Sequence, residues 1–577
     1  MSAEDLVFTF TASPMKRIFD TDMGEKNFTY ISGMRNEPLS FSLAYRSLGK
    51  KGENGRAPDT PISLRVRAEI PVSVYKTCKV SYAAAECEDA KKDATGGCPD
   101  ILQPRNPSPE IIHMPLDSGT RLPYYEKDEP NTLNASCFAT QSALIAINEE
   151  GKTLPAGDYT VTVEVIGLMS GKVLREHSVT VHLIDASLPE NDLMYTNWFH
   201  YDALSDITHV PVWSDAFFVL LEKYLCNSVK NGMNTLLFPT FTPPLDTVIG
   251  GERMNVQLVK IKKNGEDYAF DFSLAERFVT VARRAGIKTF EHTHLFSQWG
   301  AEHAINIYAE VDGEEKRIFD YTTDASDKEY VRFLEAYLRA LSDFAKKTEI
   351  ENDILYHISD EPVMQTIEGY RRAKALMRSI FPNGKFADAL DDYAFYKEGL
   401  VEIPIVDVES IENYDGRCDS LMLYYTGGEV RPGIANRILT SAPQKTRALG
   451  LHLFRYKAKG FLHWAYNYYY GRMSSGCFHP AFDPCFYKNI PGVTYLVYPD
   501  TDGSPLPSLR EKQMLAAMND YRALRLLESL TSYEEALSLC EKFLGTKISV
   551  TTIPESGEAA LGLREAINKR IEMEINK

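Results

Sequence analysis

The segment DILYHISDEP, residues Asp353–Pro362, decides how the central part of the chain is read. Its apolar first half has the length and composition of a short buried strand, and it runs directly into the adjacent carboxylates Asp360 and Glu361. Pro362 disfavours helical geometry at Glu361, because a residue that precedes proline is pushed towards extended backbone. The segment therefore predicts two acids at the C-terminal end of a strand rather than on a solvated helical face.

Seven further apolar segments of strand length lie between residues 190 and 505, and helical patterns alternate with them. In Asp215–Gly232, Leu274–Gly286 and Lys328–Lys347, apolar residues recur at helical spacings of three and four, and Gln444–Gly460 is predicted as another helix. This alternation predicts a (β/α)8 barrel. A doubly wound open sheet is the alternative, because one sequence does not give strand order. The eight predicted strands are Met194–Trp198, Thr235–Phe238, Thr289–His292, Ile354–Ile358, Phe386–Leu390, Ile403–Val406, Leu421–Tyr424 and Gly460–Trp464.

The flanking regions have different patterns. Apolar and polar residues alternate in Ser63–Tyr82, Asp158–Gly167 and His177–Ala186, which predicts an antiparallel β-sandwich, and the polar stretch Glu86–Ser108 predicts an exposed loop. Amphipathic patterns predict helices over Glu511–Leu530, Tyr533–Leu544 and the last residues of the chain. We therefore expect an N-terminal β-sandwich over residues 1–189, a catalytic (β/α)8 barrel over 190–505 and a C-terminal helical segment over 506–577.

The composition is that of a folded protein with more than one domain. The chain has 577 residues, of which 44% are hydrophobic and 25% charged. Its net charge of −17 argues against nucleic acid or an anionic membrane as a partner. The first ten residues, MSAEDLVFTF, lack the pattern of a secretory signal, and no apolar run has the length of a membrane span. We expect a cytoplasmic protein without membrane insertion; its oligomeric state is not predicted.

The cysteines and short motifs indicate no cofactor. The nine cysteines are scattered without a CxxC pair, as is typical of reduced, structural cysteines. A disulfide among Cys78, Cys87, Cys98 and Cys137 is the alternative if the chain is exported. No GxGxxG motif follows a predicted strand and no GxxxxGK[ST] motif is present, so that we expect no nucleotide cofactor.

Aromatic and polar side chains follow most of the predicted strands, where a (β/α)8 barrel carries its functional groups. Aromatic rings pack on the C–H faces of sugars while amides and carboxylates bind hydroxyl groups, so this lining favours a carbohydrate ligand. A buried aromatic residue at such a position is equally well explained by core packing, as for Tyr468–Tyr470. The candidate binding residues are Trp299, Trp464, Tyr466, Asn467, His292, Asp388 and Tyr425.

Two histidines of one predicted strand end could be metal ligands. His292 and His294 are spaced as alternate residues on one side of a strand, where two metal ligands could lie. No firm third ligand accompanies them, so no metal site is predicted. The alternative is that both are hydrogen-bonded structural histidines.

The adjacent acids carry the catalytic hypothesis. Two neighbouring carboxylates do not both ionise easily, so that one can stay protonated while the other is an anion. Glycoside cleavage uses that combination, and we expect Asp360 and Glu361 to be the catalytic pair. Adjacent residues do not suit the usual arrangement on opposite sides of the sugar; they suit a mechanism in which the substrate's own 2-acetamido oxygen is the nucleophile. The structural alternative is that Asp360 caps the next helix and Glu361 pairs with an arginine such as Arg371.

Five sequence motifs, in this order and spacing, resemble glycoside hydrolase family 123, the β-N-acetylgalactosaminidases with a (β/α)8 domain and an N-terminal β-sandwich. The resemblance covers roughly residues 190–530. The motifs are NWFHYD (Asn197–Asp202), HLFSQWGAE (His294–Glu302), HISDEP (His357–Pro362), GFLHWAYN (Gly460–Asn467) and YPDTDGSPLPSLR (Tyr498–Arg510), which the DYRAL helix follows.

The resemblance implies a retaining enzyme that cleaves β-linked N-acetylgalactosamine from glycans or glycolipids, with the 2-acetamido group as nucleophile. Asp360 matches the family's acetamide-orienting Asp, and Glu361 matches its general acid/base. Trp299, Trp464, Tyr466 and Asn467 lie in matching motifs, which implies roles in the pocket. Exported members of the family carry a signal, and the start of this chain departs from that pattern.

Two other functions stay open from the residues. One is a glycosidase of the same fold that acts on another sugar through a direct carboxylate nucleophile, which would be Asp388 or Glu291. The other is a carbohydrate-binding protein without catalysis, although the Asp360–Glu361 pair argues against it.

Overall fold

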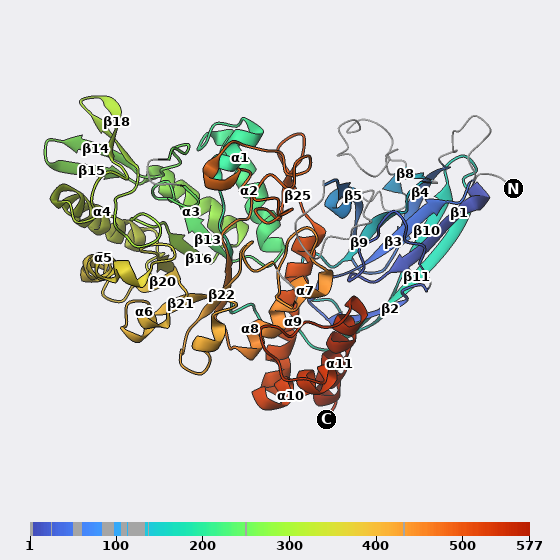
Figure 1. Ribbon diagram of the computed structural model, residues 1–577. Helices are drawn as coiled ribbons and strands as arrows, with labels where there is room; N and C mark the ends of the chain where they lie inside the picture. The colour runs from blue at the N-terminus through green and yellow to red at the C-terminus, as the bar shows by residue number, and fades with distance from the viewer. Residues whose placement is uncertain are drawn as a thin grey trace.

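The computed structural model has three parts, which Figure 1 shows as a β-rich N-terminal part on the right, a barrel on the left and C-terminal helices between and below them. Among the described helices, none combines the length and apolar character needed to cross a lipid bilayer. The structure describes residues 4–24, 26–49, 60–82, 97–105, 112–113, 133–136, 138–247, 251–430 and 433–577.

The N-terminal part is built from two sheets with an apolar core between them. One sheet has the order β1-β3-β9-β5-β6 and the other β2-β11-β10-β4-β7, with β8 paired to β4. The predicted β-rich N-terminal part is thus confirmed. The strands are β1 (Val7–Ala12), β2 (Tyr30–Met34), β3 (Leu39–Ser47), β4 (Thr60–Arg67), β5 (Val72–Val80), β6 (Cys98–Arg105), β7 (Ile112–His113), β8 (Leu133–Ala135), β9 (Gln141–Ile147), β10 (Gly157–Gly167) and β11 (Val173–Ile184).

One prediction for this region is wrong in part. Within the predicted exposed loop Glu86–Ser108, residues 98–105 form strand β6, which pairs with β5 and buries Ile101 and Leu102. Its two prolines misled the prediction, yet β6 is an edge strand, where a missing N–H costs little. Apart from Gly97, the rest of the predicted loop lies outside the described residues. Cys78 and Cys98 are free thiols, and Cys87 and Cys137 also lie outside the described residues.

The central part is a closed barrel of eight parallel strands in chain order, which confirms the predicted (β/α)8 fold and excludes the open sheet. The first strand pairs with the last, Met194 lying opposite Gly460. All eight predicted strands are confirmed to within two residues at each end. They are β12 (Met194–Asn197), β13 (Thr235–Phe238), β16 (Thr289–His292), β19 (Ile354–Tyr356), β20 (Lys385–Ala389), β21 (Ile403–Asp407), β22 (Met422–Tyr424) and β23 (Gly460–His463).

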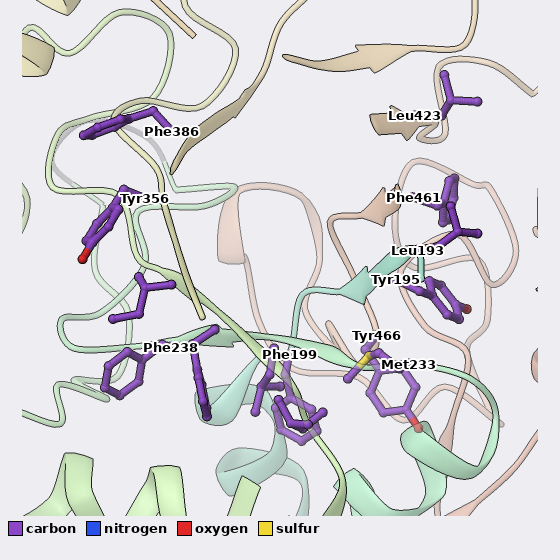
Figure 2. Packing of buried hydrophobic residues seen from close by; sticks show 14 of the residues in the cluster. Leu193, Tyr195, Phe199, Met233, Phe238, Tyr356, Phe386, Leu423, Phe461 and Tyr466 are labelled. Atoms are coloured by element: carbon purple, nitrogen blue, oxygen red, sulfur yellow. The ribbon is translucent and has the colours of Figure 1, made fainter. Parts of the chain in front are cut away.

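Side chains of each barrel strand alternate between the interior and the layer under the helices. Leu237, Leu355 and Leu462 belong to the interior cluster. Their neighbours Phe238, Tyr356 and Phe461 belong to the outer cluster, part of which Figure 2 shows. This alternation decides which strand-end residues reach the pocket.

The barrel helices follow the prediction except at one place. The predicted helix Gln444–Gly460 is two short helices, α7 (Pro443–Arg447) and α8 (Leu449–Arg455). The chain leaves α8 early because Lys457 adopts a left-handed conformation (φ 52°) before strand β23. The other helices are α1 (Tyr201–Thr208), α2 (Asp215–Lys230), α3 (Ser273–Ala285), α4 (Lys328–Lys347), α5 (Ile367–Ile380) and α6 (Tyr393–Lys397).

Long connections after β13, β16 and β23 enlarge the face of the barrel at the C-terminal ends of its strands. The loops after β13 and β16 supply a four-stranded sheet of order β15-β14-β17-β18, made of β14 (Lys260–Asn264), β15 (Asp267–Asp271), β17 (Ile307–Val311) and β18 (Glu314–Phe319). The longer connection after β23 runs to β24 (Tyr498–Pro499) and β25 (Pro505–Leu506).

A buried ion pair joins the N-terminal part to the C-terminal helices α9 (Leu509–Leu530), α10 (Tyr533–Leu544) and α11 (Gly557–Ile575). Arg510 at the start of α9 donates from Nε to Asp100 Oδ2 of β6 at 2.9 Å, and both side chains are inaccessible to solvent. The Arg510 guanidinium also donates to the carbonyl oxygens of Gly492 (2.6 Å) and Tyr495 (2.9 Å). One side chain thus connects β6, α9 and the connection after β23.

We expect Arg510→Met to lower the free energy of unfolding by about 3–5 kcal/mol, because it leaves the Asp100 carboxylate buried without its cation. Urea denaturation followed by circular dichroism measures the change. The control is Arg284→Met, which removes an ion pair with Glu222 whose arginine is 60% exposed; its unfolding midpoint should stay at the wild-type value. Equal midpoints for wild type and Arg510→Met would contradict the assignment.

Candidate active site

A pocket opens among residues that follow the barrel strands at their C-terminal ends, the face on which (β/α)8 barrels carry their active sites. Its volume of about 220 Å³ is below the roughly 300–1,000 Å³ of pockets that enclose drug-sized ligands, so it suits the end of a longer ligand. The lining combines acids, aromatic rings and two cations: Trp198, Leu245, Asp246, Gln298, Trp299, Asp360, Glu361, Ala389, Tyr424, Thr426, Leu462, Trp464, Arg472, Met473, Tyr487 and Lys488.

Asp360 and Glu361 both line this pocket, directly after strand β19. Gln298 donates from Nε2 to Asp360 Oδ2 at 2.8 Å, and the backbone N–H of Trp299 donates to the Asp360 carbonyl at 2.8 Å. The Glu361 N–H donates to the carbonyl of Ala389 in β20 at 3.1 Å. Backbone contacts to strand β20 and to the connection that follows β16 therefore fix the pair in place. Arg371 pairs with Glu368 and Glu398 instead, and the next helices have Val363 and Thr366 rather than Asp360 at their N-caps, which excludes the structural alternative.

Backbone strain concentrates at the pocket. Left-handed backbone is uncommon for residues other than glycine, and where it persists at functional sites the surrounding structure holds it. Five lining residues adopt it, with φ between 45° and 66°: Asp246, Trp299, Glu361, Met473 and Lys488. The side chains that they carry into the pocket are thus positioned by contacts elsewhere in the fold.

The pocket disfavours ionisation of both acids. Burial raises the pKa of Asp360, and the negative charge of Glu361 raises it further, to about 8. Burial also raises the pKa of Glu361, which a hydrogen bond from Tyr424 partly opposes. The pair therefore holds one proton between its two members near neutral pH.

More carboxylates lie beside Glu361. The Tyr424 hydroxyl lies 3.2 Å from Glu361 Oε1 and 3.4 Å from Asp391 Oδ1. Burial and the charge of Glu429 raise the pKa of Asp407 to about 8, and burial raises that of Asp391. None of these further acids lines the pocket, but the charges of Asp391 and Glu429 raise the pKa of Glu361.

A fully buried charge network lies beneath the pair. His357, in the segment between β19 and Asp360, donates from Nδ1 to Asp388 Oδ1 and from Nε2 to Glu291 Oε1, each at 3.2 Å. Burial alone would lower the pKa of His357, but the hydrogen bonds to Asp388 and Glu291 and their charges outweigh it and raise the pKa to about 10. His357 is therefore an imidazolium that neutralises acids under the strand end.

The same network contains the one group of metal-ligand side chains that the described residues bring together. Potential ligand atoms of His294, His357 and Asp388 lie within 4.8 Å of one another. The Asp388 carboxylate already accepts bonds from His357, from the Ile358 N–H (3.1 Å) and from the Tyr370 hydroxyl (2.5 Å). These bonds account for His357 and Asp388, whereas neither ring nitrogen of the buried His294 has a hydrogen-bond partner among the described residues.

Aromatic rings form the wall opposite the strand ends of β19 and β20. Trp464 packs against Tyr468 and Tyr487, with ring centroids 5.0 and 5.5 Å apart, and Trp464 and Tyr487 line the pocket. Trp299 contributes a further ring that is 42% exposed. Such a half-exposed ring offers a face on which a sugar can stack.

The structure brings four of the nine predicted site residues together in the pocket: Asp360, Glu361, Trp299 and Trp464. The other five are corrected, because all are buried away from it. The alternation of strand side chains accounts for two of them. His292 faces the helix layer, with Nε2 2.8 Å from the hydroxyl of Tyr337 in α4. Asp388 faces Tyr370 in α5.

The remaining three corrections concern packing residues. Tyr425 lies one residue past the end of β22 and packs against Phe461 in the outer layer. Tyr466 packs against Phe199 and donates to Glu511 Oε1 at 2.9 Å, and Figure 2 shows it in the outer cluster. The Asn467 amide bonds to the backbone N–H and carbonyl of His200.

Several lining residues were not predicted. Tyr424 and Gln298 contact the catalytic candidates, and both stand in strand-end segments, so alternation along β22 could have selected Tyr424 over Tyr425. Asp246, Arg472 and Lys488 come from long connections, where sequence patterns give no position.

The glycoside hydrolase 123 catalytic-domain family matches residues 198–527. None of the curated proteins compared matches the chain. A family 123 glycoside hydrolase from Clostridium perfringens, solved for the details of glycolipid glycan hydrolysis, is similar with a TM-score of 0.69 at 14% identity, over 99% of this chain and 98% of that one. A GH2 β-galacturonidase from Eisenbergiella tayi is far less similar, with a TM-score of 0.30 at 10% identity over 90% and 72% of the two chains.

The raised pKa of His357 predicts how a substitution there depends on pH. The folded-state pKa of about 10 exceeds the value of about 6.5 in an unfolded chain. The stabilisation is therefore complete below pH 6.5 and is lost as the pH rises through 10. We expect His357→Gln to lower the Tm by several degrees at pH 6, and by progressively less towards pH 10.

Differential scanning calorimetry from pH 6 to pH 10 measures the Tm of wild type and of His357→Gln. His209→Gln, at an exposed histidine, is the control and should follow wild type at every pH. A Tm difference for His357→Gln that is constant or grows with pH would show that His357 is neutral.

Proposed function

The chain belongs to glycoside hydrolase family 123, and we propose that it is a retaining β-N-acetylgalactosaminidase in which the substrate's 2-acetamido group is the nucleophile. The observation that carries this proposal is the placement of Asp360 and Glu361 side by side in one aromatic-walled pocket, where burial raises the pKa of both. One proton shared by two acids supplies both an acid and an anion.

Asp360 orients the acetamide. As the anion of the pair, it accepts a hydrogen bond from the acetamide N–H and so makes the acetamide oxygen more nucleophilic. Gln298 fixes its carboxylate by donating to Oδ2. Binding of the N–H donor favours the charged form of Asp360, which leaves the shared proton on Glu361.

Glu361 is the general acid and then the general base. It gives its proton to the glycosidic oxygen as the bond from the anomeric carbon to that oxygen breaks, while the acetamide oxygen attacks the anomeric carbon and forms an oxazoline. Asp360 stabilises the positive charge on that ring. Glu361 then takes a proton from water as the water attacks the anomeric carbon, and N-acetylgalactosamine leaves with its β configuration retained.

The burial of other acids supports this mechanism over a direct carboxylate nucleophile. Glu291 and Asp388 are inaccessible to solvent and both bond to His357. Among the described residues that line the pocket, the only other carboxylate is that of Asp246. It accepts hydrogen bonds from Tyr468 and Tyr487, which leaves it poorly placed to attack.

For the substrate, we propose glycans or glycolipids that end in β-linked N-acetylgalactosamine. The similar Clostridium perfringens protein is described with glycolipid glycan hydrolysis. The small pocket volume supports recognition of a terminal sugar.

We expect Glu361→Gln to lower kcat on an aryl β-N-acetylgalactosaminide by about 10²–10⁴-fold, because general acid–base catalysis supplies that factor. Colorimetric release of the aryl group measures the rate, and parallel assays with β-N-acetylglucosaminide and β-galactoside test the sugar. The control Glu368→Gln, an exposed acid in α5, should retain wild-type activity. Comparable turnover of the β-galactoside, which has no acetamide, would contradict the proposed nucleophile.

Tyr424→Phe tests the shared proton. The Tyr424 hydroxyl donates to Glu361 and lowers the pKa of that carboxyl, so its removal should raise the pKa and keep the catalytic proton bound to higher pH. The alkaline limb of the kcat/KM profile, expected near pH 8 from Asp360, should therefore shift upward. Tyr425→Phe, on the adjacent buried ring outside the pocket, should leave the limb in place. A downward shift for Tyr424→Phe would contradict the assignment.

A further inference from the structure

The connection that follows β23 builds one wall of the pocket, and we call residues 464–490 the wall segment. Asp246, in the connection after β13, anchors it. Asp246 Oδ2 accepts from the Tyr468 hydroxyl (2.6 Å) and the Met473 N–H (2.9 Å). Oδ1 accepts from the Tyr487 hydroxyl (3.2 Å), and the Asp246 carbonyl accepts from Ser474 Oγ (3.1 Å). One residue therefore connects two turns of the wall segment, at residues 472–474 and 484–489, to the barrel.

Both turns contain left-handed backbone at residues with side chains. Met473 and Ser474 have φ of 56° and 58°, and Lys488 and Asn489 have φ of 50° and 56°. Such a conformation is unfavourable for a residue with a side chain and persists only where the rest of the structure fixes it. The strain sits directly after Arg472 and at Lys488, so the directions in which these two residues leave the backbone are imposed by the fold.

Arg472 and Lys488 are the cations that line the pocket among the described residues. Both are exposed, and within the described part of the chain neither lies within ion-pair distance of a carboxylate. Lys488 Nζ lies 5.5 Å from the centroid of the Tyr487 ring.

Arg472 also lies within electrostatic reach of the catalytic side of the pocket. Burial raises the pKa of Tyr487; the charge of Glu361 adds to this effect, and the charge of Arg472 opposes it. The charges of Glu361 and Arg472 thus both act on the pKa of the Tyr487 hydroxyl. Because Arg472 and Glu361 line the same pocket, a group bound to Arg472 would share that pocket with a sugar whose glycosidic bond lies at Glu361.

We propose that Arg472 and Lys488 form a subsite for an anionic substituent of the substrate glycan, either a sulfate ester or the carboxylate of an acidic sugar. The inference rests on the proposed function and specifies its substrate class. A guanidinium offers paired N–H donors that match the oxygens of either group, and a neighbouring ammonium adds a point charge. The two cations would offset the repulsion that the anion of the Asp360–Glu361 pair exerts on an anionic glycan.

The test compares three substrates that share the same terminal β-linked N-acetylgalactosamine: a neutral oligosaccharide, the same oligosaccharide with a sulfate ester, and the same with a sialic acid carboxylate. The wild-type kcat/KM should be about 10-fold higher for one anionic substrate than for the neutral one, since a charged hydrogen bond contributes enough for that factor. The ratio should fall as salt is added.

In the double variant Arg472→Gln/Lys488→Gln the anionic-to-neutral ratio should fall to 1 or below, mainly through KM. Comparison of the sulfated substrate with the sialylated one shows which anion the subsite recognises. The control Arg339→Gln/Lys542→Gln removes the same charge from exposed positions on α4 and α10 and should keep the wild-type ratio. Thermal melting of each variant confirms that it is folded.

Equal kcat/KM for all three substrates in wild type, or a preference that survives in the double variant, would overturn the subsite. If wild type hydrolyses none of the three, the proposed function fails instead. The subsite is then tested by titration calorimetry of the same glycans against wild type and the double variant; a salt-sensitive preference for an anionic glycan that the variant lacks supports it, and equal affinities refute it.

Discussion

The repulsion between two adjacent carboxylates in a poorly solvated pocket is the interaction on which the site depends. Asp360 and Glu361 do not both carry charge cheaply, and burial makes the second ionisation more costly still. The fold maintains this arrangement with backbone hydrogen bonds to strand β20 and to the connection after β16, and with a left-handed conformation at Glu361. Relaxation of either acid into solvent would restore ordinary ionisation and remove the combination of acid and anion that glycoside cleavage requires.

The surrounding structure distributes charge around this pair. Beneath it, the imidazolium of His357 pairs with Glu291 and Asp388, and its charge partly offsets the rise that the charge of Asp388 causes in the pKa of Asp360. Beside it, Tyr424 donates to Glu361. Across the pocket, Asp246 fixes the wall segment, which presents aromatic rings and two cations. The active site therefore draws on the barrel core, a strand end and a long insertion at once.

Much of the fold was predictable because local patterns reflect the barrel directly. Each barrel strand is short, apolar and followed by polar residues, and all eight were found from that pattern. The catalytic pair was predictable because an apolar strand leads into two acids and a proline. The exception at Cys98–Arg105 arose because edge pairing, which tolerates its prolines, is a property of the whole sheet.

The binding residues were harder to predict, since one step along a strand changes the face on which a side chain lies. Tyr424 reaches the pocket and Tyr425 does not. The same rule turns His292 and Asp388 towards the helices. Arg472 and Lys488 could not be predicted, because their positions follow from the long-range bonds of Asp246 to Tyr468, Met473 and Tyr487.

The most direct measurement of the central claim is the dependence of kcat on the nucleophilicity of the substrate's acetamide. Aryl β-N-acetylgalactosaminides that carry zero, one, two or three fluorine atoms on the acetyl methyl group differ at that oxygen while the leaving group stays the same. If the acetamide attacks the anomeric carbon while Asp360 and Glu361 hold their single proton, kcat falls steeply with each fluorine. A rate that is insensitive to fluorination would mean that a protein carboxylate or water attacks instead, and would contradict the account.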